Sequence, residues 1–296
     1  MKSIRPFFII ILGAVTLFSC ETVIDAKLDT GPTQLSVEAT LTDQPGNQTI
    51  HLTQTAAYFN SSVPPAATGA TVQVSDKTGR VFSFTDSDND GYYVWQPKVG
   101  DTLGRVGQTY SLSITYQGDT YVASSNMNRV PTIDSLIFRR EKINPLSNQE
   151  GYQAEFYARD LAGATDYYRI KYYRNDVLQT KARDIITSQD GSFRGSADTD
   201  GLVFIRPIRQ SANPDSLYAL NDRVRIELMS LTPEAFDFWQ ELRTQITNGG
   251  LFATPPANVP TNIRNTNPKG RPAAGFFITS AVRSRSAQII PGNVRP

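Results

Sequence analysis

The chain has 296 residues with a formal net charge of +1, and charged residues make up 19% of it. A nearly neutral chain has no extended basic surface, so the composition argues against nucleic acid as a partner. The single cysteine, Cys20, excludes disulfides and cysteine metal sites within one chain, so packing alone must stabilise the fold.

Residues 1–20 have the three parts of a bacterial export signal. Lys2 and Arg5 precede an apolar run over residues 7–18, and Ser19 and Cys20 follow it. The run is shorter than the roughly 20 residues that a membrane-spanning helix needs. We therefore predict a lipoprotein signal peptide over 1–19, lipidation of Cys20 and a polar tether over 20–31. The protein would then be anchored to a membrane of the cell envelope through acylated Cys20. The alternative is an ordinary secreted protein with an accidental cysteine.

Residues 32–130 show the two-residue alternation of half-buried strands. Leu35, Val37, Ala39 and Leu41 fall on one side and polar residues on the other. The same signals, separated by turn residues, predict strands over 34–41, 48–54, 70–75, 81–85, 92–96, 109–116 and 120–124. Short strands at this spacing predict an immunoglobulin-like or fibronectin-like sandwich that ends at 126–131.

Residues 131–296 are also mainly strand, with predicted strands over 133–141, 152–157, 166–173, 202–208, 222–230 and 274–283. The fold class is therefore mainly β, with two consecutive antiparallel sandwich-like domains. In 166–173 one face carries Tyr168, Ile170 and Tyr172, and the other carries Tyr167, Arg169, Lys171 and Tyr173. This strand is either a sugar-binding platform or an ordinary strand with one wet face. The last strand, apolar on both faces, should pair centrally.

One amphipathic helix is predicted over 233–248, with Thr232 as its N-cap and Gly249-Gly250 at its end. Its aromatic side should pack on a sheet, because one stripe contains Phe236, Trp239, Leu242, Arg243 and Ile246, and Phe238 adjoins it. We expect Trp239 to be a core residue rather than a ligand contact.

The segment 251–271 contains four prolines and no regular element. Long loops within compact domains are often functional, so this segment is a candidate binding loop. Its candidate contact residues are Asn258, Asn262, Arg264, Lys269 and Arg271.

The stretch 86–91, Asp-Ser-Asp-Asn-Asp-Gly, resembles the opening of a calcium loop. Asp86, Asp88 and Asp90 alternate as calcium ligands do, and Gly91 permits a sharp turn. Pro97 occupies the twelfth position, where an EF-hand has glutamate. Calcium is the one cofactor that the sequence suggests, and a solvated hairpin turn is the favoured alternative.

Signatures of catalysis are absent from the sequence. The only histidine, His51, falls on the outer side of a predicted strand, and no nucleophile elbow, metalloprotease motif or phosphate loop is present. A carboxylate-pair hydrolase stays open, because two acids distant in the chain can meet in space.

Short matches along the chain also resemble a known family. They lie at Cys20, Asp25, 35–39, 41–42, 58–59, 64–65, 69–72, 91–93, 231–236, 249–252, 255–256, 262–263 and 275–277. Together they resemble a family of Bacteroidetes lipoproteins catalogued as domain of unknown function 4249. The resemblance implies a β-rich outer-membrane lipoprotein, often encoded near a TonB-dependent receptor, and supplies no catalytic residues.

These observations together predict a lipid-anchored accessory protein of the outer membrane that binds a ligand or a TonB-dependent receptor. The side of the membrane that it faces and its ligand stay open. An envelope structural or adhesion module is the second hypothesis, and a carboxylate-based hydrolase is the third.

Overall fold

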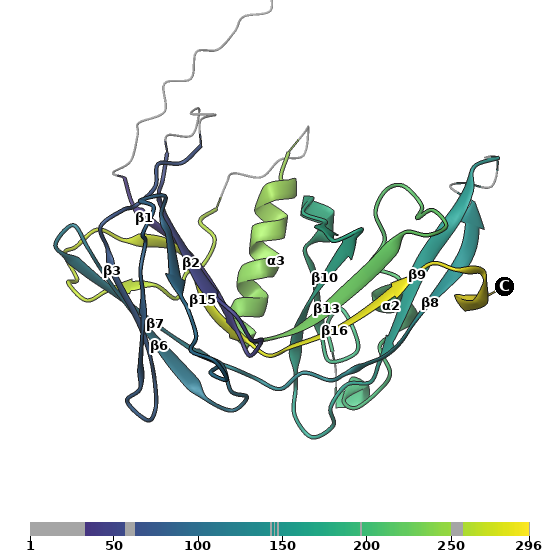
Figure 1. Ribbon diagram of the computed structural model, residues 1–296, viewed down its shortest axis with the longest axis horizontal. Coiled ribbons are helices and arrows are strands. Elements are labelled where there is room, and N and C mark those ends of the chain that lie inside the picture. Colours follow the sequence, from purple (N-terminus) through teal and green to yellow (C-terminus); the bar gives the residue numbers. More distant parts are fainter. Residues whose placement is uncertain are drawn as a thin grey trace, which may run out of the picture. The chain divides into compact units, whose positions relative to one another are not determined.

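The computed structural model describes residues 33–56, 63–142, 144, 146, 148–195, 197–249 and 257–295 (Figure 1). The described residues are mainly β, in several largely antiparallel sheets with one long helix, which confirms the predicted mainly β fold class. We name the sheets A (β15-β1-β2-β5), B (β14-β7-β6-β3-β4), C (β11-β10-β13-β16, with β12 on β10) and D (β17-β8-β9).

Every strand predicted within 32–130 is present. The strands are β1 (Leu35–Thr42), β2 (Gln48–Gln54), β3 (Thr71–Asp76), β4 (Val81–Phe84), β5 (Tyr92–Trp95), β6 (Thr109–Tyr116) and β7 (Asp119–Asn126). They alternate between buried apolar and outward polar residues, as in β6, where Leu112 and Ile114 are buried and Ser111 is exposed. Burial of one face explains why alternation located these strands.

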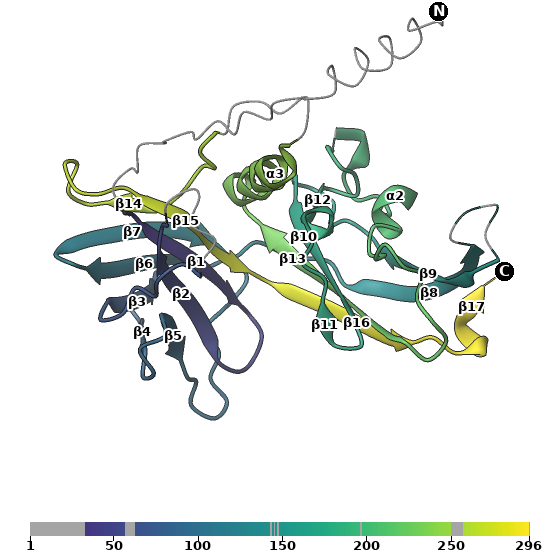
Figure 2. The ribbon, with the colours of Figure 1, turned by 90° about the horizontal axis from the view of Figure 1, so that it is seen from above.

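The pairing order differs from that of two consecutive domains. Two segments near the C-terminus, β14 (Arg264–Asn265) and β15 (Ala273–Ser280), pair with β7 and β1 respectively, and β15 runs parallel to β1 (Figure 2). The predicted boundary at 126–131 coincides with the passage from sheet B to sheet D. Because residues 264–280 return to sheets A and B, a cut at residue 130 would remove part of the first sandwich.

The prediction of one central strand over 274–283 is wrong. The chain forms β15, breaks at Ala281 and continues as β16 (Val282–Gln288), and each strand lies at the end of its sheet. Both faces of β15 are apolar for another reason. Phe277 belongs to the main core, whereas Phe276 and Ile278 pack in a second cluster with residues of the helix.

Sheets C and D contain the predicted strands β8 (Ile133–Lys142), β9 (Glu150–Ala158), β10 (Tyr167–Arg174) and β13 (Arg223–Leu231). Shorter elements that were not predicted are β11 (Val177–Leu178), β12 (Ile186–Gln189), β17 (Val294–Arg295) and the 3-10 turns η1 (Ala182–Asp184), η2 (Ala197–Thr199) and η4 (Pro291–Asn293).

The prediction of a strand over 202–208 is wrong, because the helical turn α2 (Arg206–Arg209) begins within that segment. Pro207 lies in the first turn of α2, where its missing N–H has no intrahelical partner to lose. Phe204 and Ile208, four residues apart, are both buried. That spacing fits a helical turn as well as it fits a strand.

The long helix α3 (Pro233–Thr247) begins as predicted, since the Thr232 side chain accepts a hydrogen bond from the Ala235 amide at 3.2 Å. Phe236 is buried, and Phe238 and Trp239 pack partly buried beside Phe276. The buried stripe does not extend to the end of the helix. Ile246 was predicted to belong to it but is 56% exposed. The partners of α3 in this cluster lie beside its first turns only, so the last turns are solvated.

Candidate functional site

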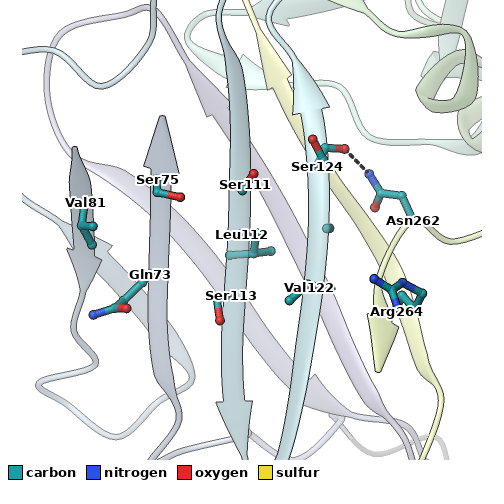
Figure 3. Close-up of a pocket in the computed structure, with 11 residues that line it drawn as sticks. Gln73, Ser75, Val81, Ser111, Leu112, Ser113, Val122, Ser124, Asn262 and Arg264 are labelled. Carbon is teal, nitrogen blue, oxygen red and sulfur yellow. Dashed lines mark hydrogen bonds between the residues drawn. The ribbon is translucent and has the colours of Figure 1, made fainter. Parts of the chain in front are cut away.

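The outer face of sheet B forms a hollow of about 540 Å³ (Figure 3). Two rows of side chains cross the strands there in register. One row contains Val81, Ser75, Ser111 and Ser124, and the next contains Gln73, Ser113, Val122 and Arg264. The alternation that buries Val74, Leu112 and Ile114 turns both rows of side chains outward, and four of these side chains are serines.

The hollow offers hydrogen-bonding groups and one cation. Within the described residues, the hydroxyl groups of Ser75, Ser111 and Ser113 have no hydrogen-bond partner, and Arg264 is exposed without an ion pair. None of the residues that line the hollow is an acid or a histidine. The surface is therefore suited to binding a polar partner rather than to transferring protons.

The structure brings only two of the five predicted loop residues to this hollow, Asn262 and Arg264. Asn258 and Lys269 are exposed outside it. Arg271 is bound to the β6–β7 turn, with its Nε 3.2 Å from Asp119 Oδ2 and its Nη1 donating to Gln117 Oε1 at 2.8 Å. Residues 251–256 of the predicted loop lie outside the described residues.

Asn262 also has a structural role that the sequence did not reveal. Its Nδ2 donates to Phe277 O at 2.8 Å, and its Oδ1 accepts from Phe277 N at 2.9 Å. One side chain therefore pairs both backbone groups of a residue at the free edge of β15, as a neighbouring strand would. A weaker contact of 3.4 Å joins Asn262 Nδ2 to Ser124 O (Figure 3).

The three aspartates of the calcium hypothesis lie in the turn between β4 and β5. Asp86 accepts hydrogen bonds from the amides of Asp90 and Gly91, both at 3.2 Å, and Asp90 accepts from the Tyr92 amide at 2.9 Å. Over the described part of the chain, no group of three His, Cys, Asp or Glu residues is arranged to hold a metal ion. The contacts support the hairpin-turn interpretation, while calcium binding itself stays a prediction.

His51 lies on the outer face of sheet A. Its ring stacks on Tyr92 with a centroid distance of 4.0 Å and an interplanar angle of 3°, and its Nδ1 is 3.8 Å from Glu38 Oε2. Strand register explains the contact, because Glu38, His51 and Tyr92 are direct cross-strand neighbours.

A second hollow, of about 520 Å³, lies beside α3 and was not predicted. Asp237 and Glu241, one turn apart on the helix, line it together with Arg194 and Tyr167. Glu241 Oε1 accepts from Gln245 Nε2 at 2.6 Å. This hollow is the place to test the hydrolase hypothesis, which stays a prediction.

Comparison with known proteins gives a family without an assigned activity. The model of a family described as a domain of unknown function (DUF4249) matches residues 21–286. No curated protein matches the chain. Cys20, the predicted lipidation site, lies outside the described residues. Among the helices that the structure describes, none has the length and apolar character needed to cross a membrane.

Proposed function

We propose that this chain, which belongs to the DUF4249 family, is a lipid-anchored binding protein of the outer membrane that works with a TonB-dependent uptake system. The observation that carries the anchoring is sequence position: the only cysteine stands directly after an export-signal pattern. Two or three acyl chains on Cys20 would anchor the protein stably without a spanning helix.

The side chains that line the hollow on sheet B support a binding role for the protein rather than a catalytic one. The hollow presents the cation of Arg264 and the hydroxyl groups of Ser75, Ser111 and Ser113, which are unpaired among the described residues, and its lining residues include no acid or histidine. Such a surface recognises a polar ligand or the polar face of a partner protein through hydrogen bonds. We assign it as the docking surface of the proposed accessory protein.

Mass spectrometry of the protein purified from membranes tests the anchor. We expect a mature chain that starts at Cys20 and carries acyl groups, and a Cys20→Ala variant that leaves the membrane fraction. An unprocessed, unmodified N-terminus would contradict the proposal.

Affinity purification from solubilised outer membranes tests the docking surface. Wild-type protein should recover a TonB-dependent receptor, and Arg264→Glu should reduce that recovery at least about tenfold by placing an acid among the polar groups. Lys269→Glu is the matched control, since it makes the same charge change outside the hollow. Equal recovery by all three proteins would rule out the hollow, and recovery of no receptor by wild type would rule out the uptake role.

A further inference from the structure

The outer face of β10 carries two cations that have no ion-pair partner among the described residues. Arg169 and Lys171 are two residues apart, so both point to the face of sheet C opposite the buried Tyr168, Ile170 and Tyr172. Both side chains are half-buried. Figure 1 shows α3 beside β10, with which it is in contact.

Arg169 is fixed beneath α3. Its guanidinium carbon lies 3.3 Å from the centroid of the Trp239 ring, so the two planes are in close contact. Its Nε is buried and has no hydrogen-bond partner in the part of the chain that the structure describes. Its cross-strand neighbours are Thr187 on β12 and Met229 on β13, and neither of these side chains can neutralise it.

The acid opposite Lys171 already binds two other side chains. Glu227 is its cross-strand neighbour on β13. Glu227 Oε1 forms an ion pair with Arg225, and Glu227 Oε2 accepts from the Tyr173 hydroxyl at 2.8 Å. Across the described ranges, no carboxylate lies within ion-pair distance of Arg169 or Lys171.

The arrangement costs stability as it stands. Burial lowers the pKa of Arg169 to about 10, and Glu38 on β1 opposes this only weakly, being 83% exposed and 3.8 Å from His51. Burial also lowers the pKa of Lys171, and the charge of Arg169 lowers it further, against the opposing charges of Glu227 and Glu38. Like charges side by side on one strand face repel each other, and a buried unpaired donor adds a desolvation cost. An anion shared by the two side chains would offset the repulsion between them.

We propose that Arg169 and Lys171 bind an oxyanion, the carboxylate or phosphate group of a small ligand, beside Trp239 on the outer face of sheet C. A guanidinium supplies donors in a planar fork and an ammonium supplies three more, which suits the oxygens of either group. Trp239 holds the guanidinium plane in place, so little ordering is needed when the anion binds. This site is separate from the hollow on sheet B and does not depend on the function proposed for it.

Trp239 provides the signal for a direct test. The chain has two tryptophans, so Trp95→Phe in the full-length protein leaves Trp239 as the only indole. We would titrate this protein with inorganic phosphate and, separately, with acetate, against chloride at matched ionic strength to remove screening effects. We expect a saturable change in Trp239 emission with a Kd of about 1 mM or below for at least one oxyanion. Phosphate alone or acetate alone would each support the proposal and identify the preferred group.

Variants separate an anion site from a purely structural stacking of Arg169 on Trp239. Lys171→Gln removes one cation and leaves the stacking pair intact, so it should weaken binding at least about tenfold. Arg169→Lys keeps the charge and loses the fork, which covers the case in which Arg169→Gln does not fold. Arg140→Gln is the control, since Arg140 is an exposed arginine paired with Glu150 on sheet D. A signal that does not saturate with either anion, or binding by Lys171→Gln as tight as that of the control, would overturn the proposal.

Discussion

Arg129 Nη2 lies 2.7 Å from Asp166 Oδ2 and joins the segment after β7 to the segment before β10. The same guanidinium also donates to the carbonyl oxygens of Leu161, Ala162 and Ala164. Asp166 is only 6% exposed. The ion pair therefore links the segment that follows β7 to a buried carboxylate directly before β10.

The first prediction is that Arg129→Ala destabilises the protein by about 2–3 kcal/mol at pH 7. Removing one partner of a buried ion pair costs about 3–5 kcal/mol, and we take less because the Arg129 side chain is 37% exposed and partly screened by solvent. Urea unfolding followed by fluorescence measures the loss.

Two variants control for this prediction. Arg129→Lys keeps the charge but not the set of hydrogen bonds to Asp166 and the three carbonyls, so it should fall between wild type and Arg129→Ala. Arg140→Ala removes an exposed pair and should leave the free energy of unfolding unchanged within error. If Arg129→Ala unfolds at the wild-type urea midpoint, the Arg129–Asp166 ion pair does not contribute to stability.

The second prediction concerns the pH dependence of stability. Burial raises the pKa of Asp190, and the charges of Asp160 and Asp200 raise it further, against hydrogen bonds from Asp166 and Thr199. The folded state therefore binds the Asp190 proton more tightly than the unfolded state does. This stabilisation is complete below the ordinary Asp pKa of about 4 and is lost as pH rises through the raised value.

In wild type, Asp190 Oδ1 accepts a hydrogen bond from the Asp166 amide at 2.8 Å. Asp190→Asn keeps an oxygen that can accept this bond, and it removes the loss of stability with rising pH because asparagine does not ionise. Its stability relative to wild type should therefore increase from pH 4 towards pH 7, as measured by urea midpoints at several pH values. Asp176→Asn, which makes the same change at an exposed turn residue, is measured beside it for comparison. A deficit in Asp190→Asn that grows with pH would contradict the prediction.

The third prediction is that Gly275→Ala destabilises the protein by about 3–5 kcal/mol, from combined backbone strain and overpacking. Gly275 has φ of +91°, and an added Cβ would collide with the Val37 carbonyl oxygen on β1. Gly118→Ala is a matched control, with φ of +82° and open space around the position, so it should lose only about 1–2 kcal/mol. Equal thermal shifts for both variants would show that contact with β1 does not matter.

Strands with one buried face were predictable from the sequence. In β1, Val37 and Leu41 are fully buried and alternate with more exposed residues, which is the signal itself. The partners of the C-terminal strand were not predictable, because Ala39 pairs with Phe277 across more than two hundred residues of chain. Apolar residues on both faces indicated burial, and the second face packs against α3 and against Leu231 at the end of β13.

The binding surface was only partly predictable. Arg264 was chosen because it lies in a proline-rich segment, yet its neighbours Ser75, Ser111 and Ser113 carry no signal beyond the polar half of an alternating strand. Cross-strand register brings them together, and register depends on pairings that one sequence does not show. The unpaired state of Arg169 was equally hidden, since it depends on which acids lie nearby in space.

The last prediction separates a structural from a ligand-binding role for Asn262. Asn262→Ala leaves both Phe277 backbone groups without their side-chain partner, which we expect to cost about 2 kcal/mol. The opened edge of β15 should also increase aggregation, because unpaired edges pair with other chains. Asn258→Ala, an exposed position in the same segment, should change the free energy of unfolding by less than about 0.5 kcal/mol. Urea unfolding and light scattering measure the two effects. Loss of receptor recovery in Asn262→Ala at full wild-type stability would show instead that Asn262 contacts the partner directly, since no weakening of the sheet would then explain the loss.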